Sequence, residues 1–431
     1  MADIRAQMGW VVACCVVTSA LTLAQPAPRS PRAAPFVAPA ANERVATAPR
    51  TATVQAGWGK KFAAENTRPT VTIANPYMDP AKPLFARAES LRCAADGSVV
   101  VSGRAGFDAE ARAVATGFWR IAVDGAVTPL HVRSTAASGR RSCGVAFDES
   151  SSAPTRFGLG ADGRILFAGR GSIQSIAPTG LVSRVAGSAG DCSNQGTVGS
   201  GDGAATAALF DEADRPVEDP DGNLWLADQR GCALRRISKD GQVTTVLGAD
   251  VLCNEATLPE NRPLVSNLEW DAAHGELVAA GAFTVARPVH DLYTLVWRIR
   301  PDGTYRRVLF AKKASRVSPA KAHLDGVRAM AVDAKGRIHI ISDLLLFEQR
   351  GWDALQLMRV DEVNATVVPI TGTRIPKSTW LADHPMDGPS SLAYFQQSRD
   401  LCFSPDGTAY VNDDILVRRI DASGQVTTWA F

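Results

Sequence analysis

The sequence lacks a charge imbalance, is poor in aromatic residues and shows no basic run in its body. Its 431 residues carry a formal net charge of +2, and Phe, Trp and Tyr make up 7% of them. Proteins that bind nucleic acid usually carry a basic patch or stripe that complements the phosphate backbone. We therefore expect no nucleic-acid partner.

Common catalytic signatures are absent as well. The chain has no His-Glu-x-x-His and no Gly-x-Ser-x-Gly, which are typical of zinc proteases and α/β-hydrolases respectively. The glycine-rich run at 199–203 (GSGDG) is not followed by Gly-Lys-Ser or Gly-Lys-Thr, so we interpret it as a turn rather than a phosphate loop. No pair of cysteines has zinc-finger spacing, which argues against a cysteine-ligated metal site.

The apolar run at residues 8–23 is 16 residues long, which is short for a membrane-spanning helix of about 20 residues. Small residues at Thr22 and Ala24 suit a signal-peptidase site, so residues 1–24 are predicted to be a secretory signal peptide. The alternative is an uncleaved membrane anchor over residues 8–23. An extracytoplasmic protein, periplasmic or secreted, is therefore expected, with membrane contact only through an uncleaved N-terminal segment.

Residues 25–61 have little to bury and are rich in proline and alanine over most of their length. They are predicted to form a disordered linker, followed by a lead-in segment at 62–89. The linker carries six basic groups against the single acidic Glu43. Contact with an anionic membrane surface is one reading of this charge, and a solvated spacer is the reading we favour.

Short apolar runs separated by turn residues make up the rest of the chain. Asp-Pro-Asp-Gly at 219–222 and Asp-Gly at 240–241 are turn sequences, in which glycine supplies a positive φ at no steric cost. They separate strand-forming runs at 216–218, 223–227, 234–238 and 243–247. The unit is predicted to be a four-stranded antiparallel meander with strands a to d.

The stretch at 201–248 resembles the NHL repeat of β-propeller proteins. The matching segments are GDGAATAALF (201–210), DPDGNLWLAD (219–228), LRRI (234–237) and KDGQVTTVLG (239–248). One departure is that Arg215-Pro216-Val217 stands where the family usually has Pro-x-Gly. The resemblance implies a six- or seven-bladed propeller and no single activity, because this fold hosts binding modules and enzymes alike.

The unit recurs six times along the chain. The a–b turn is repeated at Gly97, Gly163, Gly222, Gly275, Gly336 and Gly407. The c–d turn is repeated at Gly125, Gly180, Gly241, Gly303 and Gly424, and residues 362–364 replace it in the fifth unit. Six such units in a ring bury both faces of every sheet, whereas the repeats of an open β-solenoid would be shorter and more uniform. We predict an all-β fold, a six-bladed β-propeller of four-stranded antiparallel blades over residues 90–431.

The spacing of the turns predicts that the two faces of the ring differ. The a–b and c–d turns share one face and are tight, whereas the b–c loops and the d–a links share the other. The longer b–c loops are placed at 104–117, 283–295 and 344–355. The d–a links are placed at 133–156, 188–214, 249–266, 311–325 and 373–398. Long loops on a rigid scaffold often carry function, although drift in loop length is the alternative.

Six of the eight cysteines lie beyond the predicted signal peptide, and an even number in an exported chain predicts disulfides. Cys143, Cys192 and Cys253 fall in d–a links, and Cys232 falls in a b–c loop. A Cys192–Cys232 bond is our first choice and a Cys232–Cys253 bond the second, because these residues share or adjoin one blade.

Cys93 and Cys402 fall in the first strands of blades one and six, which become neighbours only when the ring closes. A bond between them would staple that closure, but it requires Cβ atoms about 3.5–4.5 Å apart. We expect buried free thiols at both positions.

The segment at 380–389 (WLADHPMDGP) places Asp383, His384 and Asp387 close together on the predicted long-loop face. Carboxylate and imidazole groups suit a metal or a polar ligand, and an ordinary turn is the alternative we favour for the segment itself. Trp380 in the same segment is a candidate anchor for a ligand.

Neighbouring loops offer further candidates for the same binding surface. They are Trp352, Asp353, His290, Asp291 and Tyr293. Packing of each side chain against its own loop is the alternative. Asp228, Asp343 and Asp413 repeat at the end of strand b, and we interpret them as structural residues that accept backbone hydrogen bonds.

The sequence thus predicts a monomeric binding or scaffold module for a protein, peptide or glycan, acting through its b–c and d–a loops. The rival is a metal-dependent hydrolase or lyase at the channel mouth, because some related propellers hold a metal with Glu, Asn, Asp or His on their inner strands. We find no such set of ligands here, and Ca²⁺ or Zn²⁺ is expected only under that rival. A purely structural envelope component is a third possibility.

Overall fold

The computed structural model describes residues 50–53, 70–73 and 85–430, apart from gaps within the last range. These gaps are 108–112, 135–155, 170, 188–200, 212, 229–231, 253–263, 286–290, 313–323, 325, 345–353, 372–386, 394, 396–397 and 414–415. The chain divides into two units, Met1–Ala46 and Thr47–Phe431, and every described residue belongs to the second. The predicted signal peptide and anchor segment therefore lie outside the described residues. Within those residues, no helix is long and apolar enough to cross a membrane.

Two short strands precede the main sheets. They are β1 (Arg50–Thr53) and β2 (Thr70–Ile73), which pair antiparallel. β1 falls inside the 25–61 segment for which a disordered linker is predicted. The first strand of the main sheets begins at Phe85, five residues before the predicted boundary at residue 90.

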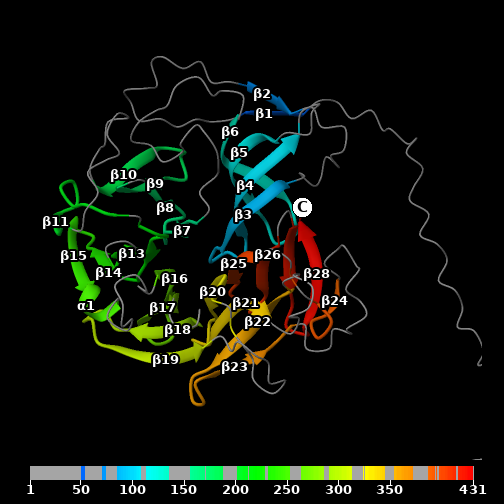
Figure 1. The fold of residues 1–431 in the computed structure, drawn as a ribbon. Helices are drawn as coiled ribbons and strands as arrows, with labels where there is room; N and C mark the ends of the chain where they lie inside the picture. Colours follow the sequence, from blue (N-terminus) through cyan, green and yellow to red (C-terminus); the bar gives the residue numbers. More distant parts are fainter. Residues whose placement is uncertain are drawn as a thin grey trace, which may run out of the picture. The chain divides into compact units, whose positions relative to one another are not determined.

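The first three main sheets follow one another along the chain (Figure 1). The first contains β3 (Phe85–Cys93), β4 (Val99–Phe107), β5 (Ala113–Ile121) and β6 (Val127–Ser134). The second contains β7 (Gly158–Leu159), β8 (Ile165–Gly169), β9 (Ser172–Ile176) and β10 (Val182–Gly187). The third contains β12 (Val217–Glu218), β13 (Leu224–Asp228), β14 (Ala233–Ile237) and β15 (Gln242–Leu247), with β11 (Gly203–Ala204) paired to β15. A short helix, α1 (Ala249–Leu252), follows.

The other three sheets have the same order of strands. The fourth contains β16 (Leu264–Asp271), β17 (Glu276–Val285), β18 (Asp291–Ile299) and β19 (Tyr305–Lys312). The fifth contains β20 (Ala329–Val332), β21 (Ile338–Leu344), β22 (Ala354–Asp361) and β23 (Thr366–Pro369). The sixth contains β25 (Ser398–Phe403), β26 (Ala409–Asp413), β27 (Leu416–Ile420) and β28 (Gln425–Ala430), with β24 (Gly388–Pro389) paired to β28. The predicted six-bladed propeller is confirmed.

The blades are held together by apolar side chains on both faces of each sheet. In β13, for example, all five residues are buried, because this strand is covered by a neighbouring blade on either side. Among the described residues, six apolar clusters form, and each joins two adjacent blades, including the sixth blade and the first. The hydrophobic core is therefore distributed around the ring, and the inner strands β3, β7, β12, β16, β20 and β25 surround its axis (Figure 1).

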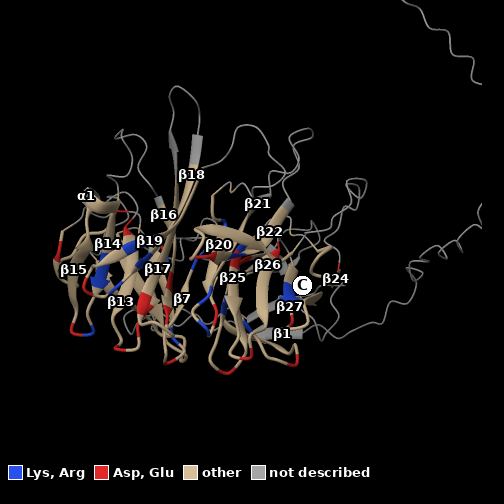
Figure 2. Cartoon of the chain, turned by 90° about the horizontal axis from the view of Figure 1, so that it is seen from below, with Lys and Arg blue, Asp and Glu red and all other residues tan. Residues whose placement is uncertain are grey.

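The predicted tight turns are present in every blade and lie on one side of the ring, which we call the turn face (Figure 2). In the third blade, Asp219 accepts backbone hydrogen bonds from Asp221 and Asn223, and Gly222 takes a φ of 82°. In the fifth blade the c–d turn forms without a glycine, and Ala365 takes a φ of 49° there. We call the opposite side, where the b–c and d–a segments begin and end, the loop face.

Two of the predicted long b–c loops are largely strand. The insertion predicted at 104–117 lengthens β4 to Phe107, and β5 resumes the ladder at Ala113. The insertion predicted at 283–295 lengthens β17 and β18, which extend toward the loop face (Figure 2). In the 283–295 insertion the ladder continues because the segment is rich in residues that fit a pleated sheet, such as Phe283, Val285 and Tyr293. The third predicted loop, 344–355, lies mostly outside the described residues.

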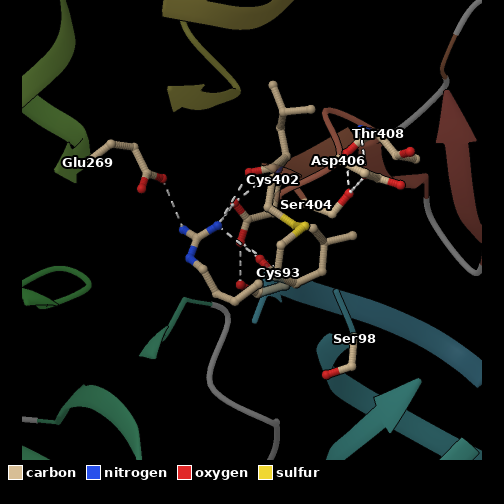
Figure 3. The surroundings of a disulfide bond; sticks show 12 residues. Cys93, Ser98, Glu269, Cys402, Ser404, Asp406 and Thr408 are labelled. Atoms are coloured by element: carbon tan, nitrogen blue, oxygen red, sulfur yellow. Dashed lines mark hydrogen bonds and ion pairs between the residues drawn. A yellow bond between two sulfur atoms is a disulfide. The ribbon is translucent and has the colours of Figure 1, made fainter. Parts of the chain in front are cut away.

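The predicted free thiols at Cys93 and Cys402 are wrong, because the two residues form a disulfide with Cα atoms 5.6 Å apart (Figure 3). The bond lies beside the apolar cluster between blades one and six, where β3 and β25 run next to each other. Cys232 is also disulfide-bonded. Cys143, Cys192 and Cys253 lie outside the described residues, so the predicted pairing of Cys232 stays a prediction.

Candidate functional site

The inner strands bring charged side chains together on the axis of the propeller. Arg92 on β3 and Asp400 on β25 come from adjacent blades, and Arg215 precedes β12 in the third blade. Asp400 accepts hydrogen bonds through Oδ1 from Arg92 Nη1 at 2.9 Å and from Arg215 Nη1 at 3.2 Å. Its Oδ2 accepts from the Ser90 hydroxyl and from the Leu91 backbone N–H. Asp400 is only 2% exposed, so this carboxylate is a buried centre of the network.

Glu269 on β16 approaches the same arginines from the fourth blade. Its Oε1 accepts a hydrogen bond from Arg215 Nη2 at 2.6 Å and lies 3.5 Å from Arg92 Nη2. The side chain remains 19% exposed, against 9% for Arg92 and 2% for Arg215. Burial raises the pKa of Glu269 to about 7, and the negative charge of Asp400 adds to this, while Arg92 and Arg156 oppose it.

Opposite blades meet across the axis. Arg92 in blade one contacts Glu269 in blade four, and Arg215 in blade three contacts Asp400 in blade six. Arg156 in blade two donates to the backbone carbonyl of Arg328 in blade five at 3.4 Å. Side chains and backbone therefore close the axis at this level, and a ligand at the axis would have to replace one of these contacts.

The loop-face mouth of the axis is also charged. Arg156, Asp214 and Arg328 stand at the starts of their inner strands, at the ends remote from the a–b turns. Arg156 pairs with Asp214 at 3.1 Å, and Arg328 is exposed. Together with the buried layer, the residues named here comprise four arginines and three carboxylates, so this group carries a positive balance. That balance favours an anionic ligand over a cation.

Two nitrogen atoms of the buried arginines have no hydrogen-bond partner in the described part of the chain. They are Arg92 Nη2 and Arg215 Nε, on side chains that are more than nine-tenths buried. A buried donor without an acceptor is costly, by about 1–3 kcal/mol for each group and more where it is charged. The network is therefore not saturated by its own carboxylates.

Metal ligation is not apparent in the same region. Among the described residues, no three His, Cys, Asp or Glu side chains group as they would around a metal ion. The rival prediction requires metal ligands clustered around the axis. The described residues at that place include Arg92 and Arg215. These two side chains do not suit a divalent cation, because a guanidinium group donates hydrogen bonds and has no acceptor atom that could ligate a metal.

A second charged region lies on the turn face between blades four and five. Its cavity of about 380 Å³ is lined by Arg298, Arg306, Arg337, Glu362 and neighbouring residues. Arg298 is buried and donates to Glu362 at 2.7–3.0 Å and to the carboxylate of Asp271 at 2.5 Å. Arg306 also pairs with Glu362 at 3.1 Å and Arg337 with Asp333 at 2.6 Å, so three of the cations around this cavity are already paired within the protein.

Most of the binding residues predicted from sequence lie outside the described residues. These are Trp380, Asp383, His384, Trp352, Asp353 and His290. Tyr293 is described, and its ring stacks on Phe310 at 5.3 Å between centroids. This contact joins β18 to β19 within one blade, and a ligand role for Tyr293 stays a prediction.

Asp387 is also described, and its carboxylate is engaged within blade six. Its Oδ1 accepts hydrogen bonds from Arg418 Nη2 and Thr428 Oγ1, both at 3.0 Å. Asp202 in blade three makes the matching contacts with Arg235 Nη2 at 2.8 Å and Thr245 Oγ1 at 2.9 Å. The two aspartates therefore fasten β24 and β11 to their blades, and a ligand role for Asp387 stays a prediction.

Asp228, at the end of β13, accepts a backbone hydrogen bond as predicted, and the contact shown for Asp413, at the end of β26, is an ion pair. Asp228 accepts the Asp211 backbone N–H at 3.0 Å and pairs with Arg235 at 3.3 Å. Asp413 lies 3.5 Å from Arg418. The side chain of Asp343 lies outside the described set.

The axial charges were not identified from the sequence, although a positional signal exists. Arg156, Arg215 and Asp400 each stand four residues before the residue that opens the a–b turn of their blade. An alignment of the six units on their a–b turns would have brought these charges into one column. Glu269 and Arg92 stand two residues closer to the turn and share a second column.

Solved structures similar to this chain share its fold and little of its sequence. A protein of unknown function from Bacteroides thetaiotaomicron is 14% identical, with a TM-score of 0.45 over 80% of this chain and 69% of that one. Virginiamycin B lyase from Staphylococcus aureus is 11% identical, with a TM-score of 0.39 over 81% and 85%. A gluconolactonase from Xanthomonas campestris is 14% identical, with a TM-score of 0.36 over 63% and 73%. Comparisons with protein-family profiles and with curated proteins find no match. Similarity at this level describes the propeller fold alone.

Proposed function

We propose that this protein is an exported binding module, an NHL-type propeller that holds a protein, peptide or glycan on its loop face. The observation that supports this most is the difference between the two faces. The turn face is made of short turns closed by their own hydrogen bonds. The loop face carries the extended β4–β5 and β17–β18 hairpins. An elaborated face on a rigid ring is the usual place for recognition.

Export is supported by the disulfide between Cys93 and Cys402. Structural disulfides persist in oxidising compartments and are rare in the cytosol, where thiols are kept reduced. The additional bond at Cys232 supports the same location. The predicted signal peptide at residues 1–24 would provide the route out of the cytoplasm.

The test is to apply the purified protein to a glycan array and to a peptide array, with three versions side by side. They are the wild type, a loop-face variant (Trp352→Ala with Trp380→Ala) and a turn-face control. The control is Val123→Ala with Val363→Ala, two side chains that are 62% and 92% exposed. We expect the wild type and the control to retain the same probes, and the loop-face variant to lose at least tenfold in affinity.

Three results would contradict the proposal. If the loop-face variant retained the probes as well as the wild type does, Trp352 and Trp380 would not belong to the binding surface. If a retained probe were hydrolysed or cleaved in a reaction that depends on added Ca²⁺ or Zn²⁺, the enzyme hypothesis would be favoured over the binding module. Absence of any retained probe in all three versions would favour a structural component of the envelope.

A further inference from the structure

We propose that Arg92 and Arg215 form a carboxylate-binding site on the axis, in which the side chain of Glu269 is an internal and displaceable occupant. This inference rests on the proposed function in one respect. It identifies an acidic group as the part of the ligand that is recognised at the axis.

The two arginines already hold one carboxylate incompletely. Glu269 Oε1 accepts a hydrogen bond from Arg215 Nη2 but lies 3.5 Å from Arg92 Nη2, which is left without a hydrogen bond. Arg215 Nε also lacks an acceptor among the described residues. A guanidinium group binds a carboxylate best when two parallel N–H groups meet its two oxygens. Glu269 is held too far from Arg92 to satisfy that geometry.

Glu269 is the carboxylate in the network that is free to leave. Among the described residues, its polar contacts with the arginines run through Oε1, and its side chain is 19% exposed. Asp400, in contrast, is held by Arg92, Arg215 and Ser90 and is 2% exposed. Displacement of Glu269 costs one close hydrogen bond and one longer ion pair, and an incoming carboxylate restores both.

The charges around the site favour a monoanion. Asp400 stays in place after the exchange, only 3.2 Å from Arg215 Nη1, and would repel a doubly charged phosphate more than a carboxylate. Above pH 7, where Glu269 is ionised, the exchange of one carboxylate for another keeps the buried charge unchanged, which avoids the desolvation cost of adding a further charge. Arg156 and the exposed Arg328 at the loop-face mouth would attract the ligand toward the axis.

The pH dependence of the exchange follows from the groups that face Glu269. These are Arg92 from β3, Arg156 and Arg215 from the segments that lead into the inner strands of blades two and three, and Asp400 from β25. Burial raises the pKa of Glu269 to about 7, so this side chain becomes neutral as the pH falls below 7. An ordinary ligand carboxylate remains ionised there, so its binding should tighten between pH 8 and pH 6.

The test uses calorimetric titration of the full chain with four probes. N-acetylglycine represents the carboxyl terminus of a peptide, glucuronate represents an acidic sugar, N-acetylglycinamide is the neutral control and inorganic phosphate is the dianion control. We expect one or both carboxylates to bind at least tenfold more tightly than the amide and the phosphate. Binding of N-acetylglycine alone would identify a peptide terminus as the source, and binding of glucuronate alone would identify a glycan.

Variants separate the site from a general attraction of anions. Glu269→Ala removes the internal occupant, so we expect carboxylate affinity to rise at least tenfold and to lose its dependence on pH between 6 and 8. Arg215→Gln should abolish binding. Because that change could unfold the protein, Arg328→Gln at the exposed mouth serves as a second variant, with an expected loss of threefold or more. Arg184→Gln, an exposed arginine on the outer strand β10, is the matched control and should change nothing.

The inference is overturned if Glu269→Ala binds no carboxylate, or if phosphate binds as tightly as the carboxylates. It is also overturned if Arg184→Gln and Arg328→Gln lose affinity equally, which would indicate a diffuse electrostatic effect. If the axial probes fail while the loop face still retains its array probes, the axial site alone is wrong. If the axial probes bind but the loop-face variant retains every array probe, the proposed surface is wrong and the axial site stands.

Discussion

Cys93 and Cys402 are joined by a disulfide although 309 residues separate them in the sequence. They lie on β3 and β25, the inner strands of the first and last blades. In the described part of the chain, each of these blades is built from consecutive strands of one segment, and no strand from one end completes the sheet of the other. The covalent bond and the polar contacts beside it therefore link the two ends of the ring directly.

Removal of this bond should lower the free energy of unfolding. We expect the double variant Cys93→Ala with Cys402→Ala to lose about 3–5 kcal/mol, because the bond restricts a very long loop in the unfolded chain. Urea unfolding of the variant and of the oxidised wild type measures the difference. Addition of a reductant to the variant then measures the contribution of the remaining disulfides, including the bond at Cys232. A loss below about 1 kcal/mol would show that apolar packing between the two blades closes the ring unaided.

The sequence was sufficient to predict the blades because their turns are specified locally. Aspartate and glycine at each a–b turn fix its backbone, as the Asp219 hydrogen bonds and the positive φ of Gly222 show. The disulfide was missed because it depends on how two strands 309 residues apart lie across a blade interface. No local sequence pattern indicates that two residues so far apart in the chain lie close together in the fold.

The axial network was missed for a related reason. The alternation of side chains along β3 and β25 is interrupted by register shifts near Ala88–Ser90 and Ser398–Leu401. A strict period of two therefore does not identify which of these residues face the axis. The cross-axis pairs, such as Arg215 with Asp400, also require the ring to be closed before their charges meet.

Asp400 should be essential for stability. Replacement by Asn keeps the shape but removes the negative charge from between Arg92 and Arg215, and leaves two buried cations poorly compensated. We expect a loss of about 3–5 kcal/mol, which is typical when one partner of a buried ion pair is removed. Chemical unfolding at pH 7 measures it. Asp96→Asn is the matched control, since Asp96 also pairs with an arginine, Arg120, at 3.1 Å but is 57% exposed.

That exposed pair should contribute no more than about 1 kcal/mol. Equal losses in the Asp400→Asn and Asp96→Asn variants would contradict a special role for the axial carboxylate. A loss confined to Asp400→Asn would support it.

Glu269 should make the protein less stable as the pH rises. Its pKa is about 7 in the folded state and near 4.5 in the unfolded chain, so the folded state binds more protons between these values. Stability then falls as the pH increases from 4.5 to 7, by at most about 3 kcal/mol. We expect Glu269→Gln to be more stable than the wild type at pH 8 and to differ less at pH 5. Urea unfolding at both pH values tests this, and a larger advantage at pH 5 would refute it.

His339 should have the opposite effect on the acid side. It is 4% exposed, its Nε2 lies 3.2 Å from Asp333 Oδ2, and its ring packs on Phe403. Burial lowers the pKa of His339 to about 4. The imidazole is therefore protonated below about pH 6.5 in the unfolded chain, whereas in the folded state it stays neutral down to about pH 4. The free energy of unfolding consequently decreases as the pH falls from 6.5 to 4.

The loss attributable to His339 should reach at most about 3 kcal/mol at pH 4. We expect His339→Gln to show a flatter decline in the free energy of unfolding over this range. The difference between the two proteins at pH 7.5, where the histidine is neutral in both states, reports the change in packing alone and is subtracted. Because Glu269 contributes the opposite slope between pH 4.5 and 6.5, the measurement is best repeated in the Glu269→Gln background. An unchanged decline in that background would show that the buried imidazole accepts its proton without unfolding.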